Sequence, residues 1–454
     1  MKLNLLLYKS TFFLILIFNS NFCFSQSFNE NFLGANRTEL YLDDLIGKKV
    51  GIVGNHTSLI YNKGKYIHLV DSLLSTNIDV KKIFSPEHGF RGNADAGEKI
   101  GNNIDEKTGL EIISLYGTNR KPNTEQLKGL DVLVFDIQDV GARFYTYIST
   151  LHYVMEAAAE NNIKLIVLDR PNPNGHYVDG PIRETELKSF VGMHPIPIVH
   201  GMTIGEYALM INGQGWLNNK LSCDLKIIKM KNYDRKIVYN TPLKPSPNLP
   251  NTKSINLYPS LCLFEGTNVS IGRGTNSQFQ IIGNPDWKQY NFSFTPVSMP
   301  GAKFPKHKNI KCFGIDLRNT KRLSQINLKW ILEAYNVTNN KEEFFSKYLL
   351  DVIKKKTNEN FSLDRCYANG HTYGSSGHFH TDWEDGSGRT ALLYANDTWR
   401  QEWGGKTVFN LNGEYHYTEC YPNSLVIFPS ILWHEVTPVE GTGRYAMSQF
   451  ISMA

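Results

Sequence analysis

The run DVLVFDI at residues 131–137 decides the fold of the first half of this chain. It is short and almost wholly apolar, as expected for a strand that is buried on both faces of a parallel sheet. The amphipathic stretch at residues 147–161 follows it and is rich in helix formers. Similar apolar runs lie at residues 49–54, 80–84, 111–115 and 164–168. This alternation predicts an α/β domain with a mainly parallel sheet and helices on both of its faces.

After the α/β region, the composition and the expected secondary structure of the chain change twice. Residues from about 240 to 300 are rich in Pro, Asn, Ser and Gly, and we expect a long loop region that includes the irregular segment 244–250. The polar segment from about 320 to 360 is expected to be helical and to form a junction. From about residue 365 onward, short strand-like runs alternate with Gly, Asn and Pro turns. That pattern predicts an all-β antiparallel barrel or jelly roll.

Length and charge narrow the function classes. The 454 residues are enough for two or three domains. The net charge of +5 is small for this length, and no basic run is interleaved with aromatic residues, so the sequence does not support nucleic-acid binding. No GxGxxG motif and no P-loop motif follows the first expected strand, which disfavours dinucleotide and nucleotide chemistry.

The N-terminus has the layout of a secretory signal peptide. Lys2 and Lys9 precede an apolar run at residues 11–18, and small residues lie just before Gln26. Cleavage of residues 1–25 predicts a secreted or periplasmic protein without a stable membrane span; an uncleaved membrane anchor is the alternative. Of the six cysteines only Cys23 lies in this segment, and the others are scattered without a CxxC pair. They indicate neither a disulfide framework nor a zinc site.

Polar side chains follow the expected strands at the points where these strands end. Binding sites in parallel sheets form just beyond the carboxyl ends of the strands, so we expect these side chains to converge on one crevice. A crevice rich in carboxylates, Tyr, Asn and Arg suits a polyhydroxylated or anionic ligand, and its carboxyl groups suit glycoside cleavage. The alternative for Asp139 and Asp169 is an ordinary turn or helix cap. The candidates are His56, Glu87, Asp139, Arg143, Tyr145, Arg170, His200, Glu265 and Asn268.

Several motifs in this region carry a resemblance to one family. They include FSPEHGFRG at 84–92, VFDIQDVGARFYTYISTL at 134–151, LDRPNPNG at 168–175 and YPSLCLFEGTNVSIGRGT at 258–275. From about residue 36 to 320 the chain resembles the exo-β-N-acetylmuramidases of the NamZ type. The resemblance implies a Rossmann-like catalytic domain with a smaller auxiliary domain. It also implies removal of terminal N-acetylmuramic acid from peptidoglycan fragments, a reaction that needs no cofactor.

The resemblance implies a role for each candidate. Glu87, in the motif Ser-Pro-Glu-His-Gly, is the expected general acid, and Asp139 and His200 are further expected catalytic residues. An Arg in the pocket would suit the lactyl carboxylate of muramic acid as a planar two-point donor. The family's C-terminal part is expected to be cut short near residue 335. The expected substrate-binding residues are His56, Arg143, Tyr145, Arg170, Glu265 and Asn268.

A second constellation occupies the last quarter of the chain. His380 and Asp382 are two residues apart, so a strand would place both side chains on one face. His434 can supply a third ligand from a neighbouring strand, and Arg444 follows ten residues later. Two imidazoles and one carboxylate make the facial triad of non-haem Fe(II) oxygenases. The alternative is that these histidines are ordinary surface or core residues.

Residues 362–452, which also hold the Trp-Gly-Gly turn at 403–405, resemble the 2-oxoglutarate, Fe(II)-dependent dioxygenases of the prolyl 4-hydroxylase-like branch. The resemblance implies that His380, Asp382 and His434 bind Fe(II). It implies that Arg444 and Tyr373 bind the co-substrate 2-oxoglutarate, whose decarboxylation to succinate accompanies hydroxylation. The oxygenase substrate is not indicated by the sequence.

Four parts are therefore expected: a signal peptide at 1–25, a Rossmann-like catalytic domain at 36–230, a truncated auxiliary region at 231–335 and a dioxygenase-like double-stranded β-helix (jelly roll) at 345–454. The expected partners are peptidoglycan-derived muropeptides or sugars. Export conflicts with the cytoplasmic supply of 2-oxoglutarate and Fe(II), so three hypotheses stay open. In the first hypothesis, both sites are active. In the second, only one site is active: either the dioxygenase alone, or the muramidase with a barrel that is vestigial or a non-catalytic binding module. In the third, the fusion is an artefact.

Overall fold

A computed structural model of the chain describes residues 32–62, 64–87, 89–91, 103–341, 343–345, 368–371, 381, 389–394, 404–419, 424–429, 431–437 and 447–450. The expected signal segment lies outside these residues. So do four residues of the expected oxygenase site, namely Tyr373, His380, Asp382 and Arg444.

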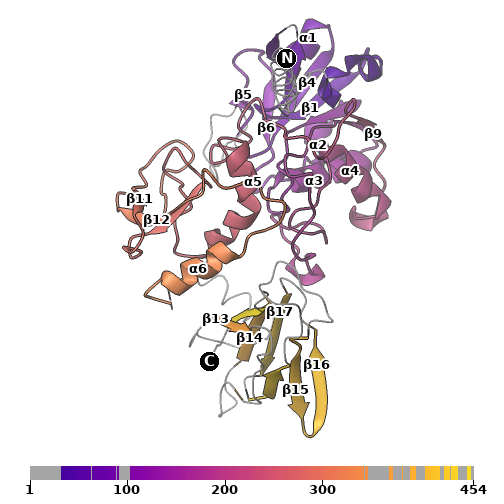
Figure 1. The fold of residues 1–454 in the computed structure, drawn as a ribbon. Helices are drawn as coiled ribbons and strands as arrows, with labels where there is room; N and C mark the ends of the chain where they lie inside the picture. Colours follow the sequence, from indigo (N-terminus) through magenta and orange to yellow (C-terminus); the bar gives the residue numbers. More distant parts are fainter. Residues whose placement is uncertain are drawn as a thin grey trace, which may run out of the picture.

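A mostly parallel sheet organises the first half of the chain (Figure 1). Its spatial order is β5 (Asn103–Ile104), β6 (Glu111–Ser114), β4 (Asp79–Ser85), β1 (Lys49–Gly54), β7 (Val132–Asp136), β8 (Lys164–Leu168) and β9 (Leu225–Ile228). All neighbouring strands run parallel except β5, which pairs with β6 in the antiparallel sense at the edge. The five apolar runs that the sequence predicted as strands are β1, β4, β6, β7 and β8.

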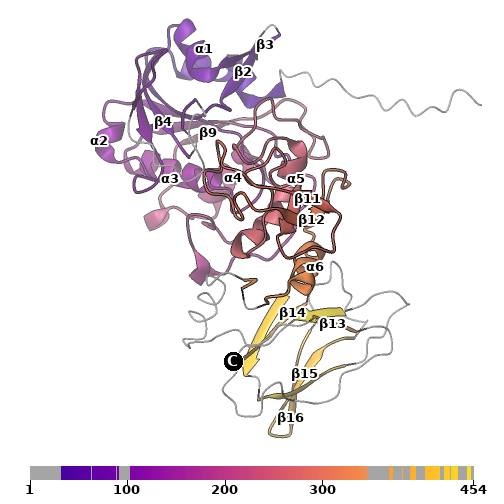
Figure 2. The same cartoon turned by 90° about the vertical axis from the view of Figure 1, so that its left-hand side faces the viewer.

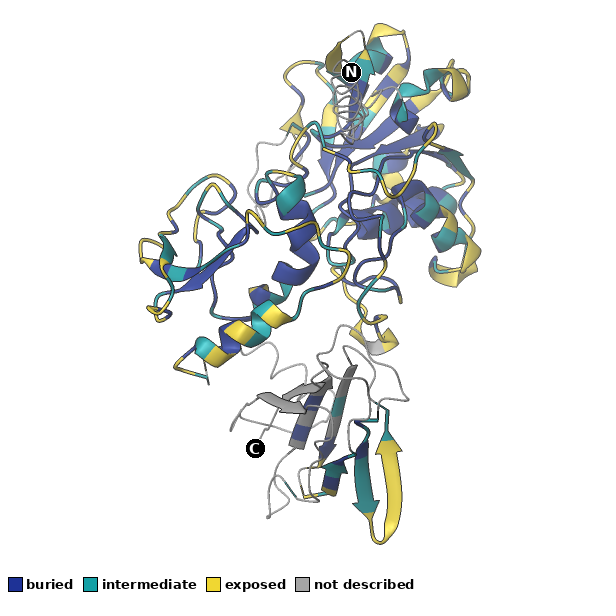
Figure 3. Cartoon of the chain, in the orientation of Figure 1, coloured by how far each residue is buried: buried dark blue, intermediate teal, exposed yellow. Residues whose placement is uncertain are grey.

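The sheet separates two hydrophobic cores. Every residue of β7 is buried, and successive side chains point to opposite faces. Leu133 and Phe135 therefore belong to one core, and Val132 and Val134 to the other. Helices α3 (Tyr147–Glu160) and α4 (Ile204–Gly213) pack against β8 and fill the first core, and α1 (Leu69–Ser75) packs against β4 in the second. Figures 2 and 3 show the layers and the buried sheet between them.

Smaller elements connect these layers. Strands β2 (Leu59–Asn62) and β3 (Lys65–His68) form an antiparallel hairpin that leads into α1. The short helix α2 (Thr124–Leu127) begins at Asn123, whose side chain forms a capping box with Gln126. Single 3₁₀ turns lie at Gly34–Asn36, Thr38–Leu40, Leu42–Asp44, Thr185–Leu187, Asn218–Lys220 and Cys262–Gly266.

The loop region expected at 240–300 is only partly irregular. Residues 244–250 contain no helix or strand, as predicted. The prediction was wrong for the residues that follow, because α5 (Thr252–Leu261), β10 (Ile281–Asn284) and β11 (Phe292–Phe294) lie within it. Strands β10 and β11 both pair with β12 (Cys312–Asp316) in an antiparallel sheet, and α6 (Lys329–Val337) follows.

The C-terminal part contains only strands among its described residues, and all of their pairings are antiparallel. Strand β13 (Ala368–His371) pairs with β19 (Met447–Phe450), and β14 (Arg389–Tyr394) pairs with β17 (Ser424–Pro429). Strand β15 (Thr407–Leu411) lies between β16 (Glu414–Thr418) and β18 (Trp433–Val436). The predicted antiparallel character is confirmed for these strands.

Within the described part of the chain, none of the helices has the length and apolar character needed to cross a bilayer.

Candidate active site

A cavity of about 490 Å³ lies at the carboxyl ends of the central strands. Glu87 comes from the end of β4, and Tyr116 comes from the end of β6. The segment between β7 and α3 supplies the wall from Phe144 to Tyr147. Further lining comes from more distant parts of the chain, including Arg120, Phe190, Asn248, Tyr258 and Arg273. The rule that sites form beyond the ends of parallel strands therefore located this cavity correctly.

Glu87 is the carboxylate in the lining of this cavity, and it is half-buried. The hydroxyl of Thr146 donates to its Oε2 atom over 3.4 Å. Tyr116 is hydrogen-bonded to it as well, and burial together with the Glu87 charge raises the pKa of Tyr116 to about 12. The Tyr116 hydroxyl therefore keeps its proton at neutral pH and can donate it to the carboxylate.

Three tyrosines form the aromatic wall of the cavity. The rings of Tyr145 and Tyr147 meet edge to face with centroids 4.8 Å apart, and Tyr258 meets Tyr145 at 6.0 Å. The hydroxyl of Tyr145 donates to the carbonyl of Pro245 over 2.8 Å. Because Pro245 begins the wall that contains Asn248, this bond holds the irregular segment 244–250 against the sheet.

His56 supports the same segment. Its Nε2 lies 2.8 Å from the carbonyl oxygen of Lys244, which can only accept, so this nitrogen carries the proton. Burial lowers the pKa of His56, which keeps the ring neutral. His56 is not part of the lining, so the structure places it behind the wall rather than at the ligand.

Asp139 and His200 lie together but outside the lining, and both are buried. The Nε2 of His200 is 3.9 Å from Oδ2 of Asp139. Burial raises the pKa of Asp139 to about 7 and lowers that of His200 to about 3. Oδ2 of Asp139 accepts the N–H of Gly141 at 2.6 Å. Gly141 has φ +77° and would push a Cβ atom to within 2.0 Å of Asn172, so only glycine suits this turn.

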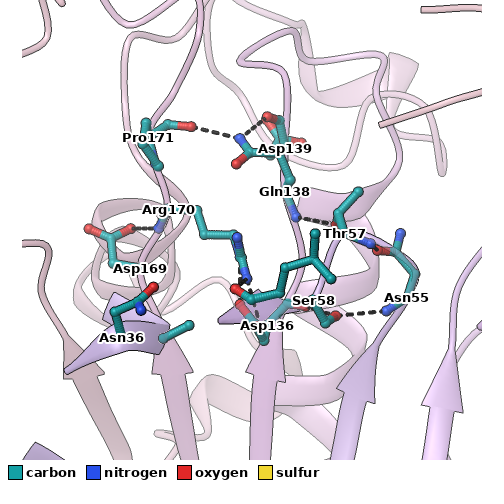
Figure 4. Close-up of polar contacts among 12 residues, drawn as sticks. Asn36, Asn55, Thr57, Ser58, Asp136, Gln138, Asp139, Asp169, Arg170 and Pro171 are labelled. Carbon is teal, nitrogen blue, oxygen red and sulfur yellow. Dashed lines mark hydrogen bonds and ion pairs between the residues drawn. The ribbon is translucent and has the colours of Figure 1, made fainter. Parts of the chain in front are cut away.

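Two predicted arginines bind groups inside the scaffold, and Figure 4 shows one of them, Arg170. Arg170 is fully buried, forms a two-point ion pair with Asp136 and donates to the carbonyl of Leu59 at 2.9 Å. Arg143 donates to the carbonyls of Pro181 and Ile196 and so braces the loop that follows β8. Neither side chain belongs to the lining of the cavity.

The last two predicted pocket residues are also engaged with protein groups. Glu265 accepts two hydrogen bonds from Arg273, at 2.9 and 2.6 Å, and Arg273 does line the cavity. Asn268 accepts from Asn284 and His307 through its carbonyl oxygen and joins two loops of the auxiliary region. Asp169, considered as a cap, accepts the N–H of Gly205 at 2.8 Å in the first turn of α4.

Of the predicted site residues, the structure brings Glu87 and Tyr145 to the cavity itself. Sequence reasoning missed Tyr116, Arg120, Phe190 and Tyr258. The strand-end rule could have found Tyr116, because it lies two residues beyond the end of β6. Phe190 and Tyr258 carry no comparable signal, since a loop and a helix bring them in from elsewhere.

The oxygenase site can be assessed through His434 alone. This residue lies on β18 and is 6% exposed, with its ring 4.7 Å from that of Phe428. Its Nδ1 is 2.8 Å from the carbonyl oxygen of Leu432, so Nδ1 carries the proton and Nε2 carries the lone pair. The described residues contain no cluster of three potential metal ligands, and His380 and Asp382 are not among them.

The fold and the cavity define an α/β enzyme with a carboxylate and a tyrosine wall at the carboxyl edge of a parallel sheet. The family models for the N-terminal and C-terminal parts of the exo-β-N-acetylmuramidase NamZ match residues 50–253 and 256–368. The chain is 43% identical over 300 residues to the peptidoglycan β-N-acetylmuramidase NamZ of Bacillus subtilis, which covers 62% of this chain and 70% of that protein. The chain thus belongs to the NamZ family.

Two solved structures agree with this assignment. Both are DUF1343 family proteins from Bacteroides fragilis. One is 47% identical with a TM-score of 0.64 and covers 71% of this chain and 89% of its own. The other is 32% identical with a TM-score of 0.57 and covers 67% and 82%. A further family model, that of the 2OG-Fe(II) oxygenase superfamily, matches residues 366–452 and overlaps the second NamZ match at residues 366–368.

Proposed function

We propose that this protein is an exported glycoside hydrolase that removes terminal N-acetylmuramic acid from peptidoglycan fragments. Two observations support the proposal: the membership of the NamZ family and the cavity in which Glu87 is held by two hydroxyl groups. The cavity volume of about 490 Å³ lies in the range of small-molecule sites. Its mixture of tyrosine rings, an amide and hydroxyl groups suits a sugar.

Glu87 acts as the general acid toward the glycosidic oxygen. A general acid passes through an ionised and a protonated state in each cycle. Hydroxyl groups can donate to the first state and accept from the second, so Thr146 and Tyr116 keep the carboxyl group oriented in both. This arrangement is the single observation that carries the proposed role.

Asp139 and His200 act as positioning residues in this account. They do not line the cavity, but Asp139 holds the turn at Gly141, and Val199 next to His200 bridges Ala142. That turn leads directly into the segment that supplies Tyr145 and Thr146. His56, Arg143, Arg170, Glu265 and Asn268 support the same walls through the contacts described above.

Product analysis tests the proposed reaction. The protein without residues 1–25 is incubated with peptide-free glycan chains that begin with N-acetylmuramic acid. Free N-acetylmuramic acid should accumulate from the first time point as the chains shorten by one sugar. Accumulation of disaccharides, or no cleavage at all, would contradict an exo-acting muramidase.

A second function is favoured by the match of residues 366–452 to the oxygenase superfamily. We assign the parallel sheet to the Rossmann-like class and the C-terminal strands to a jelly roll, with domain limits of 36–230, 231–335 and 345–454. His434 suits an Fe(II) ligand, because its Nδ1–H is held by a carbonyl and its Nε2 carries the lone pair. His380 and Asp382 would complete the ligand set, and Arg444 and Tyr373 would bind 2-oxoglutarate.

When bound, Fe(II) and 2-oxoglutarate would supply hydroxylation coupled to the formation of succinate. The chain's own contribution would be to bind and orient both groups. Export would separate the C-terminal barrel from the cytoplasmic supply of Fe(II) and 2-oxoglutarate. The competing proposal is therefore that the barrel is a non-catalytic binding module. Succinate production from 2-oxoglutarate by the purified chain with added Fe(II) separates the two. The absence of succinate would leave only the binding role.

A further inference from the structure

Arg120 lines the cavity, but the proposed reaction assigns it no role. It lies in the loop after β6, is exposed, and lines the cavity together with Glu87 and Tyr116. The electrostatic influence of both residues reaches the Tyr116 hydroxyl, since Glu87 raises the pKa of Tyr116 and Arg120 lowers it. The acid and the cation are therefore both close to Tyr116.

An aromatic stack positions the guanidinium of Arg120. Its Cζ atom lies 4.4 Å from the centroid of the Phe190 ring, a distance typical of a cation–π contact. Phe190 in turn stacks on Tyr153 with centroids 6.2 Å apart and an interplanar angle of 14°. The hydroxyl of Ser149 donates to the carbonyl of Phe190 over 2.7 Å, which fixes the loop that carries this ring. A contact with a ring face uses none of the five N–H donors of the guanidinium.

The other arginines around the cavity already bind protein groups. Arg170 is paired with Asp136 and Arg273 with Glu265, and Arg143 serves two backbone carbonyls. Arg120, by contrast, forms no ion pair and no hydrogen bond with any residue that the structure describes. All of its N–H donors are thus available to a ligand, whereas Arg273, the other arginine in the lining, gives Nε and Nη2 to Glu265.

We propose that Arg120, held on Phe190, binds the lactyl carboxylate of the N-acetylmuramic acid residue and so selects muramic over glucosamine sugars. This inference rests on the proposed function, because it takes the substrate from it. The lactyl ether and the glycosidic bond belong to the same pyranose ring, at O3 and C1. One ring in the cavity would thus present its carboxylate to Arg120 while its glycosidic oxygen faces Glu87. A guanidinium meets a carboxylate through two parallel hydrogen bonds, which gives both affinity and orientation.

Paired substrates test the assignment. The wild type, Arg120→Gln and Arg120→Lys are assayed on 4-nitrophenyl β-N-acetylmuramide and on 4-nitrophenyl β-N-acetylglucosaminide, which lacks the lactyl group. Loss of a charge-assisted contact should lower kcat/KM on the muramide about 10- to 100-fold in Arg120→Gln, chiefly through KM. The glucosaminide should change less than about 2-fold, and Arg120→Lys should recover part of the loss. Arg318→Gln, at an exposed arginine paired with Asp316, is the matched control.

Calorimetric binding of free N-acetylmuramic acid and N-acetylglucosamine separates this inference from the proposed function. If the wild type cleaves neither glycoside, the proposed reaction fails, and the binding data still decide the carboxylate site. A preference of the wild type for N-acetylmuramic acid that disappears in Arg120→Gln would support the site. Equal binding of the two sugars by the wild type, or an equal loss on both substrates in the variant, would overturn it.

Discussion

The guanidinium of Arg170 and the carboxylate of Asp136 form a two-point ion pair within the parallel sheet, with Nε–Oδ1 at 2.5 Å and Nη2–Oδ2 at 2.8 Å. Both residues are completely or almost completely removed from solvent. Asp136 is the last residue of β7, and Arg170 follows the end of β8 by two positions. The pair thus ties together the carboxyl ends of β7 and β8.

Removal of one partner should destabilise the whole domain. Arg170→Met leaves a buried carboxylate without its cation, which should lower the free energy of unfolding by about 3–5 kcal/mol. Urea denaturation followed by circular dichroism measures the change. Arg318→Met on the surface should stay within about 0.5 kcal/mol of the wild type. Equal stability of the two variants would show that the ion pair does not hold the sheet.

A chain of hydrogen-bonded, buried histidines should make the free energy of unfolding depend on pH. The hydroxyl of Tyr207 lies 2.8 Å from Nδ1 of His194, whose Nε2 lies 2.9 Å from Nδ1 of His152, and His152 lies 3.6 Å from Glu156. Burial lowers the pKa of His152 to about 4. The unfolded chain therefore binds the proton near pH 6.5 and the folded chain does not, so stability is lost as the pH falls from about 6.5 to 4.

Comparison with a variant isolates this contribution. The free energy of unfolding of the wild type should fall by roughly 3 kcal/mol more than that of His152→Gln over this interval, since one pKa unit corresponds to about 1.4 kcal/mol. Urea denaturation at several pH values measures both. Substitution of the exposed His416 by Gln should leave the dependence unchanged. Parallel curves for the wild type and His152→Gln would refute the buried neutral chain.

Asp139 should have the opposite dependence on pH. Burial raises its pKa to about 7, so the folded state holds a proton that the unfolded state has released above about pH 4. Stability therefore falls as the pH rises from about 4 to 7, and above pH 7 an ionised carboxylate remains in the interior. Asp139→Asn should therefore gain roughly 2–3 kcal/mol relative to the wild type between pH 5 and 8. Denaturation midpoints of both proteins at the two pH values provide the test. A stability difference between the variant and the wild type that is the same at both pH values would argue against the raised pKa of Asp139.

The proposed oxygenase function depends on His434. His434→Ala should weaken Fe(II) binding by more than about 100-fold and abolish the formation of succinate, because loss of a ligand exceeds the effect of altering its outer partners. Tryptophan fluorescence titration and NMR detection of succinate measure the two effects. His416→Ala, on the exposed face of β16, is the control. Unchanged Fe(II) affinity in His434→Ala would remove this residue from the ligand set.

Strong local patterns account for what the sequence predicted well. The apolar runs at 49–54 and 164–168 coincide with β1 and β8 to the residue, because a strand buried on both faces needs an uninterrupted apolar stretch. Helix α5 was missed because Pro259 lies within it. The proline cannot donate to the carbonyl of Ile255, and that carbonyl accepts from the side chain of Asn174 at 3.0 Å instead. No local pattern could reveal this distant partner.

In the candidate site, too, some residues could be predicted from local patterns and others could not. Glu87 and Tyr145 follow strand ends, and topology alone brings them to the cavity. The role of an arginine depends on which groups the folded chain places around it. Arg143 donates to carbonyls of the loop near Ile196. The N–H donors of Arg120 stay available to a ligand, because Phe190 offers only a ring face. Residue type and spacing do not contain that information.

The most direct test of the central claim compares Glu87→Gln with the wild type on two leaving groups. A disaccharide of N-acetylmuramic acid and N-acetylglucosamine needs protonation of its departing oxygen, whereas 4-nitrophenol leaves with little help from an acid. We predict that kcat falls by about 10²- to 10⁴-fold on the disaccharide and much less on the nitrophenyl muramide. Glu125→Gln, an exposed carboxylate on α2, should leave both rates unchanged. Undiminished cleavage of the disaccharide by Glu87→Gln would contradict the account.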